Sequence, residues 1–155
     1  MFDLQGKVAI VTGGNGGIGL AMAQGLADAG ARIAVVGRNT DKLQAAVAGL
    51  CKQGRQAKAY AVDVCDEVAV SGLMAQVADD FGRLDILVNN AGINIRKQVQ
   101  DLALSEWQAV LDTNLTSAFL CSRAAYPQLN KRGGKVSHQH RLHDVDFWCL
   151  VRAGL

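Results

Sequence analysis

The 155-residue sequence contains no apolar run close to the roughly 20 residues that a membrane-spanning helix needs. Its formal net charge is only +2, whereas nucleic-acid binders usually carry clustered basic faces. The first seven residues, MFDLQGK, include Asp3 and no apolar run, so a signal peptide is not expected. These absences predict a cytoplasmic protein with neither a membrane nor a nucleic acid as its partner.

The sequence also lacks any Cys-x-x-Cys pair, and its four cysteines (Cys51, Cys65, Cys121 and Cys149) lie far apart. Wide spacing gives no sign of a disulfide framework, so we expect reduced, mostly buried thiols. Half of the residues are hydrophobic and only 19% are charged, which is typical of a folded globular chain. A chain of this length corresponds to one domain.

Short apolar runs alternate with segments of helical periodicity along most of the chain. Runs typical of buried strands occur at 7–12, 32–37, 57–64 and 84–92, and a fifth opens near 133–136. Helical segments occur at 18–30, at 40–54 with Thr40 as the N-cap, at 66–82, and from Ser105 to a bend or end near Pro127. Regular alternation with short connections predicts an α/β fold, a doubly wound parallel sheet with helices on both faces.

Five glycines crowd the seven positions 13–19, between the first predicted strand and the first predicted helix. Residues without side chains let a pyrophosphate approach the backbone, and the following helix start offers free N–H groups and a positive dipole end. A tight strand-to-helix turn can also require glycine for steric reasons alone. A P-loop is not expected, because no Lys-Ser or Lys-Thr follows the last glycine.

The spacing Thr12-Gly13-x-x-x-Gly17-Ile18-Gly19 resembles the cofactor fingerprint of the short-chain dehydrogenase/reductase family. Asp63-Val64, the segment NNAG at Asn89–Gly92, and Asn114 within LDTNLTSAF match further family motifs, in the family's order. The resemblance covers residues 5–136. It implies a Rossmann-type sheet, here with about five of an expected seven strands, and an NAD(P)-dependent oxidoreductase acting on CH–OH or carbonyl groups.

The same resemblance assigns roles to particular residues. It implies that Asp63 hydrogen-bonds the adenine, that the NNAG segment lines the nicotinamide-ribose pocket, and that Asn114 has a structural and catalytic role. The implied cofactor-binding residues are Thr12, Gly13, Asn15, Gly17, Ile18, Gly19, Arg38, Asp63, Val64, Asn90, Ala91 and Gly92.

The end of the second predicted strand bears on the choice of cofactor. NAD-selective folds usually place an acid there to bind the ribose 2′-hydroxyl, but this sequence has Gly37 followed by Arg38 and Asn39. A guanidinium can pair bidentately with a 2′-phosphate, so NADP is favoured over NAD. The alternative is that Arg38 is an ordinary solvated loop residue.

Residues 90–114 resemble the family branch that acts on sugars and sugar acids. That likeness places Arg96 near the pocket mouth, where it either pairs with a substrate carboxylate or is a plain loop arginine. The family also forms homo-oligomers, dimers or tetramers, through the long helix, so apolar side chains of that helix are expected to be exposed or to contact a partner. These side chains are Trp107, Leu111, Leu115 and Phe119.

Residues 137–155 do not resemble the family, which would continue with a serine-bearing strand and a Tyr-x-x-x-Lys pair. The only tyrosines are Tyr60 and Tyr126, and neither has a lysine four residues later. All three histidines, His138, His140 and His143, fall here beside Asp144, so a zinc site is one reading. The favoured interpretation is that residues 137–155 are read in a shifted reading frame, because the shifted codons permit the missing family residues. No metal site is therefore predicted. We therefore expect residues 1–136 to be a dinucleotide-binding domain with impaired catalysis, or a non-catalytic fragment that associates with other subunits.

Overall fold

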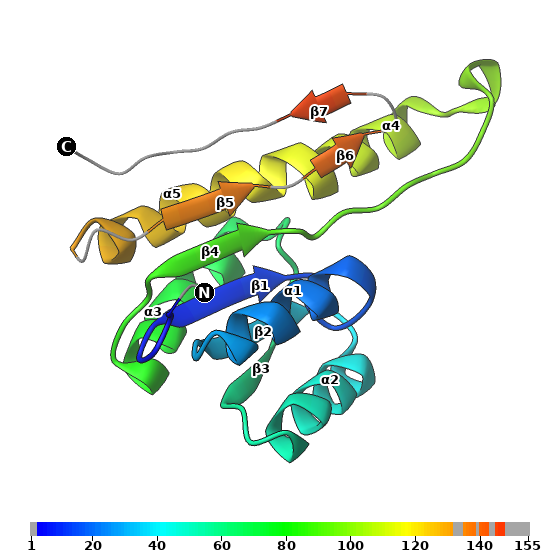
Figure 1. The fold of residues 1–155 in the computed structure, drawn as a ribbon. Helices are drawn as coiled ribbons and strands as arrows, with labels where there is room; N and C mark the ends of the chain where they lie inside the picture. The colour runs from blue at the N-terminus through cyan, green and yellow to red at the C-terminus, as the bar shows by residue number, and fades with distance from the viewer. Residues whose placement is uncertain (1–2, 132–134, 139, 143–144, 148–155) are drawn as a thin grey trace.

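The computed structural model describes residues 3–131, 135–138, 140–142 and 145–147. Strands and helices alternate from the amino terminus (Figure 1). The elements are β1 (Val8–Thr12), α1 (Gly17–Asp28), β2 (Arg32–Gly37), α2 (Thr40–Lys52), β3 (Ala57–Ala61), α3 (Glu67–Phe81), β4 (Ile86–Asn89), a 3-10 turn η1 (Val99–Asp101), α4 (Leu104–Leu111), a π-helical segment η2 (Asp112–Thr116), α5 (Ser117–Asn130), β5 (Lys135–His138), β6 (His140–Leu142) and β7 (Val145–Phe147).

The main sheet has five parallel strands in the order β3-β2-β1-β4-β5. The chain moves outward from β1 to β3 and then returns to place β4 on the other side of β1, so the strand order reverses between β1 and β4. In open α/β sheets such a reversal creates a crevice at the carboxyl ends of the strands. The predicted doubly wound parallel sheet is confirmed, and the crevice positions the candidate site.

Helices pack on both faces of this sheet (Figure 1), and the side chains between sheet and helices form two apolar cores. Alternate residues of β1 point to opposite faces, as a strand period of two requires. Ile10 packs with the side chains of α3 and α5, whereas Val11 packs with those of α1 and α2. All five residues of β1 are buried, which explains why its first four residues are apolar rather than alternating with polar ones.

The long helix differs from its prediction in two ways. It begins at Leu104, where the side chain of Glu106 accepts a hydrogen bond from the Ala103 N–H at 3.0 Å, and it contains the π-helical segment η2. It passes through Pro127 and ends at Asn130, close to the predicted position. The last turn holds because Ala125 and Leu129 are buried in the core, so packing outweighs the missing proline N–H.

Smaller corrections concern helix caps and strand ends. Asn39, not Thr40, caps α2, because its Oδ1 accepts a hydrogen bond from the Lys42 N–H at 2.9 Å. The third strand ends at Ala61 and the fourth spans only Ile86–Asn89, because the polar residues that follow leave the sheet to form the crevice. Gly30, with φ of 97°, follows α1 in the left-handed conformation, as its predicted position requires.

The expectation of mostly buried thiols is wrong for two of the three described cysteines. Cys51 lies on the outer side of α2 and Cys65 in the loop after β3, and both are exposed; Cys121 is buried. Burial in the apolar core raises the pKa of Cys121 to about 12. Cys149 lies outside the described residues.

The fifth strand predicted near residues 133–136 is present as β5, which joins the main sheet beside β4, and β6 and β7 pair antiparallel with each other. The sequence patterns predict neither β6 nor β7. His143 and Asp144, two of the residues considered as zinc ligands, lie outside the described residues. Across the residues that the structure describes, no three His, Cys, Asp or Glu side chains form a group able to hold a metal ion. None of the helices in the described part of the chain is both long enough and apolar enough to cross a bilayer.

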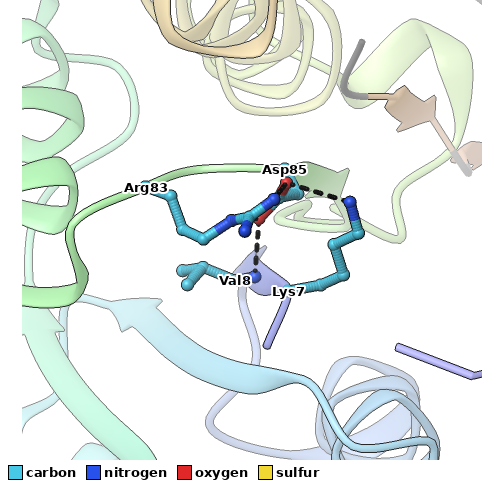
Figure 2. Close-up of polar contacts among 4 residues, drawn as sticks. All are labelled: Lys7, Val8, Arg83 and Asp85. Carbon is cyan, nitrogen blue, oxygen red and sulfur yellow. Dashed lines mark hydrogen bonds and ion pairs between the residues drawn. The ribbon is translucent and has the colours of Figure 1, made fainter. Parts of the chain in front are cut away.

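A buried carboxylate joins β1 to β4 at the amino ends of the strands (Figure 2). Asp85, which is 3% exposed, accepts hydrogen bonds from the Val8 N–H at 3.0 Å and from the Arg83 guanidinium, and its carboxylate lies 3.5 Å from the Lys7 ammonium. Burial would raise the pKa of Asp85, but these donors together hold it below its ordinary value. This cluster lies at the sheet end opposite the crevice and is structural.

Candidate functional site

A cavity of about 380 Å³ lies at the carboxyl ends of the strands. The segments that follow β1, β2, β3 and β4 converge on it, so residues distant in the sequence share one site. Its lining residues are Gly13, Asn15, Gly37, Arg38, Asn39, Lys42, Val62, Asp63, Val64, Ala91, Gly92, Ile93 and Thr113.

The glycine turn, residues 13–19, contains glycines of two kinds. At Gly19 a methyl group would lie 2.3 Å from the Gly13 carbonyl oxygen and 2.3 Å from the Asn90 amide nitrogen, so close packing of backbones excludes a side chain. At Gly16 and Gly17 a methyl group would meet nothing within 4 Å. Tight packing therefore accounts for Gly19 but not for Gly16, whose bare backbone faces open space at the start of α1.

Thr12 and Asn90 connect the glycine turn to the end of β4. The Thr12 hydroxyl oxygen accepts hydrogen bonds from the N–H groups of Asn90 and Ala91, both at 3.0 Å. The Asn90 side-chain amide donates to the carbonyl oxygens of Thr12 at 3.1 Å and Gly13 at 3.3 Å. These two predicted cofactor residues thus fix the shape of the turn, and neither lines the cavity itself.

Arg38 and Asp63 face each other across the cavity from the ends of β2 and β3. The Asp63 Oδ1 atom accepts a hydrogen bond from the Cys65 N–H at 3.0 Å, and its Oδ2 lies 3.9 Å from the Arg38 guanidinium. The two side chains remain 67% and 46% exposed, so solvent screens the ion pair. The neighbouring Val64 is 6% exposed and contributes its side chain to the core rather than to the cavity mouth.

Three polar residues that were not assigned from the sequence also line the cavity, namely Asn39, Lys42 and Thr113. Lys42 lies in the first turn of α2, where the Asn39 cap places it near the end of β2. A lysine one helical turn after Arg38 is a signal that could have indicated a second cation. Gly37 lacks a side chain where the Asn15 amide approaches, since a methyl group there would lie 2.9 Å from the Asn15 nitrogen.

Asn114, within η2, holds the loop after β4 in place. Its Oδ1 accepts a hydrogen bond from the Ile93 N–H at 2.8 Å, and its Nδ2 donates to the Ile93 carbonyl oxygen at 3.0 Å. Asn114 is buried, and both ends of its amide are engaged by one backbone residue. Its structural role is thus visible in the fold, while its catalytic role stays a prediction.

The predicted residues fall into two sets in the structure. Those that line the cavity are Gly13, Asn15, Arg38, Asp63, Val64, Ala91 and Gly92. Those that shape the turn beside it are Thr12, Gly17, Gly19 and Asn90, whereas Ile18 lies exposed in the first turn of α1. Their assignment as contacts of a bound cofactor stays a prediction.

Neither tyrosine is placed to donate a proton into this cavity. Tyr60 is buried on β3, and its hydroxyl donates a hydrogen bond to Asp80 at 2.7 Å. Burial, followed by the Asp80 carboxylate, raises the pKa of Tyr60 far above its ordinary value. Tyr126 lies near the far end of α5 and is half exposed. A tyrosine that could protonate an alkoxide is therefore missing from the cavity lining in the described part of the chain.

Arg96 lies in the exposed loop between β4 and α4. Residues 94–98 line a shallow depression there, separate from the main cavity. Lys97 pairs with Glu106 at 2.5 Å, whereas Arg96 has no ion-pair partner among the described residues.

The parallel sheet, the glycine turn and the cavity at the carboxyl ends of the strands define a Rossmann-type α/β protein. A family model described as short chain dehydrogenase matches residues 7–137, and the chain belongs to that family.

Gluconate 5-dehydrogenase of Gluconobacter oxydans strain 621H is 37% identical over 137 residues, which are 88% of this chain and 54% of that protein. A short chain dehydrogenase from Burkholderia cenocepacia J2315, solved in complex with NADP, has a TM-score of 0.82 at 43% identity. The match covers 88% of this chain and 56% of that protein. An NAD+-bound xylitol dehydrogenase has a TM-score of 0.84 at 38% identity, covering 88% and 53%. This chain thus spans about half the length of the relatives that it matches.

Proposed function

We propose that this chain binds a nicotinamide dinucleotide in the 380 Å³ cavity, with the diphosphate against the glycine turn. The observation that carries the proposal is the bare backbone at Gly16, where a methyl group would meet nothing within 4 Å and the backbone is extended; Gly17 beside it has a φ of 52°, which itself favours glycine. A helix of 12 residues begins there, and its free N–H groups and dipole favour an anion. The residues present therefore fit the group.

We further propose that NADP is preferred to NAD. The end of β2 carries no acid to bind a ribose 2′-hydroxyl, and Arg38 and Lys42, which follow it, both line the cavity. Two cations match a phosphate better than a hydroxyl. Among the structural neighbours one holds NADP and another NAD+, so the preference rests on this chain's own residues.

For a chain that carries the full set of family residues, the reaction that we propose is oxidoreduction of a CH–OH or carbonyl group on a small molecule. Sugar acids are the candidate substrates. The likeness to gluconate 5-dehydrogenase supports this class. The Arg96 guanidinium, without an ion-pair partner among the described residues, is suited to a substrate carboxylate. When bound, the nicotinamide supplies the hydride chemistry. The protein residues would orient it, with Asn114 fixing the loop at Ile93.

As it stands, the 155-residue chain carries no Tyr-x-x-x-Lys, and general acid catalysis is worth about 10²–10⁴-fold in rate. We therefore propose that the chain binds the cofactor but turns substrate over slowly or not at all. Titration of the chain with NADPH, followed by nicotinamide fluorescence, is expected to show saturable binding. Incubation of the same sample with gluconate and NADP is expected to give no increase in absorbance at the nicotinamide band. Absence of binding would refute the proposed binding of a nicotinamide dinucleotide, and steady turnover would refute the proposed loss of catalysis.

A second candidate function is a non-catalytic subunit that associates with other copies. The side chains of Trp107, Leu115 and Phe119 are 50%, 54% and 59% exposed along α4, η2 and α5, where a helix facing water would ordinarily carry polar residues. Sedimentation velocity is expected to show association that Phe119→Asp weakens. The matched change Asn130→Asp, at an exposed position of the same helix, should leave it unaltered. A concentration-independent monomer would contradict this candidate.

A further inference from the structure

The Asp63 carboxylate has a fixed orientation in the cavity. Its Oδ1 atom accepts the hydrogen bond from the Cys65 N–H at 3.0 Å, which closes a turn at the end of β3. The remaining oxygen, Oδ2, is the one that faces Arg38 at 3.9 Å. Asp63 can therefore bind a second donor mainly through Oδ2, the atom that the Arg38 guanidinium approaches.

Arg38 and Asp63 are each suited to a different part of a dinucleotide. A guanidinium at the end of β2 suits a ribose 2′-phosphate, and a carboxylate at the end of β3 suits the amino group of an adenine. Without a ligand, the two side chains form a solvent-screened ion pair, with the guanidinium 3.9 Å from Oδ2. A ligand that offers an adenine alone has to share Oδ2 with a cation, which weakens that oxygen as an acceptor.

We propose that the Arg38–Asp63 ion pair determines cofactor specificity, by withholding the Asp63 carboxylate from adenine until a 2′-phosphate draws Arg38 away. This inference rests on the proposed binding of a nicotinamide dinucleotide in the cavity. The pair acts against NAD, because NAD offers Arg38 no alternative partner. It does not act against NADP, because the phosphate replaces the carboxylate as the partner of Arg38.

The charges in the cavity support this exchange. A phosphate monoester carries a charge of about −1.5 to −2 near neutral pH, so it attracts Arg38 more strongly than one screened carboxylate does. Lys42 lines the same cavity and has no ion-pair partner among the described residues, so it is available as a second cation for the phosphate. An exposed ion pair such as Arg38–Asp63 changes an equilibrium by about twofold to fivefold.

The test is a double-mutant cycle in the full 155-residue chain, read as dissociation constants for NADH and NADPH from nicotinamide fluorescence. The four proteins are the wild type, Arg38→Gln, Asp63→Asn and the double variant. With the Asp63 carboxylate present, Arg38→Gln is expected to raise the affinity for NADH about twofold to fivefold. In the Asp63→Asn background, the same change is expected to bring no gain. For NADPH, Arg38→Gln is expected to lower affinity about tenfold or more in both backgrounds.

Asp41→Asn supplies the charge-matched control. Asp41 is exposed in the first turn of α2 and does not line the cavity, so its removal changes the net charge equally without releasing Arg38. In that background Arg38→Gln should still raise NADH affinity. An equal effect of Arg38→Gln on NADH affinity with and without the Asp63→Asn change would overturn the inference while leaving cofactor binding intact. Failure of the wild type to bind either nucleotide would refute the proposed function and the inference with it.

Discussion

The variant Gly19→Ala tests whether close backbone packing is the reason for glycine at this position of the glycine turn. In Gly19→Ala the new Cβ would lie 2.3 Å from the Gly13 carbonyl oxygen, a backbone atom held in a tight turn, and 2.3 Å from the Asn90 Nδ2. Overpacking against backbone costs up to about 3 kcal/mol. Alanine in a helix returns about 1 kcal/mol relative to glycine. The expected net loss is about 2 kcal/mol in the free energy of unfolding.

The matched control is Gly16→Ala, three residues earlier. A methyl group there meets nothing within 4 Å, and the backbone φ of 178° is extended, so alanine is accommodated. Its stability should stay within about 0.5 kcal/mol of the wild type. Because the methyl group would occupy the space assigned to the diphosphate, Gly16→Ala should nevertheless weaken NADPH binding about tenfold.

Urea unfolding followed by circular dichroism measures the stabilities, and NADPH fluorescence measures binding. The loss of about 2 kcal/mol in Gly19→Ala corresponds to a lowering of Tm by about 4–8 °C for a domain of this size. The reasoning predicts that the two variants separate stability from binding. It fails if Gly19→Ala is as stable as the wild type, or if Gly16→Ala binds NADPH with unchanged affinity.

Three further predictions concern buried groups. Thr12→Val leaves the N–H groups of Asn90 and Ala91 without the Thr12 hydroxyl as an acceptor. It should lower the free energy of unfolding, measured by urea denaturation, by about 2 kcal/mol, whereas Thr12→Ser should stay near the wild type. Since the pKa of Asp85 is lowered in the fold, its stabilising contribution is present at neutral pH and lost as pH falls below about 4. Asp85→Asn should therefore lower the free energy of unfolding at pH 7 by about 2 kcal/mol and make that energy less dependent on pH in the acid range. An unchanged acid dependence would contradict this. Cys121 is buried and its pKa is raised to about 12, so it should not react with a thiol reagent at about pH 8 in the native chain. Cys121→Ala should therefore lower the number of reactive thiols only after unfolding. A lower number in the native variant than in the native wild type would show that Cys121 is accessible.

The alternation of strands and helices and the location of the crevice could be predicted from the sequence, because both depend on local patterns. The apolar run at β1 and the helix-ending Gly30 each carry their own signal. The convergence of Gly13, Asp63 and Ala91 on one cavity then follows from the parallel topology, which brings the carboxyl ends of the strands together.

Features that depend on tertiary packing could not be predicted in the same way. The helix continues through Pro127 because Ala125 and Leu129 are buried, which is a property of the assembled core. The exclusion of a side chain at Gly19 depends on the nearby Gly13 and also on Asn90, which is distant in the sequence.

The cap of α2 is a further case that the sequence leaves open. Asn39 and Thr40 are adjacent and both residue types cap helices, so either could begin α2, although asparagine, the observed cap, ranks above threonine. The cap at Asn39 places Lys42 in the first turn of α2, at the cavity.

The central claim is that an anionic dinucleotide rests against the bare backbone of the glycine turn. It is tested most directly by amide chemical shifts in the 155-residue chain, recorded by NMR during titration with NADPH. The account predicts saturable shifts at the amides of Gly16 and Gly17, with Asp85, at the opposite end of the sheet, unchanged. NADPH binding that leaves Gly16 and Gly17 unperturbed, or no binding at all, would contradict it.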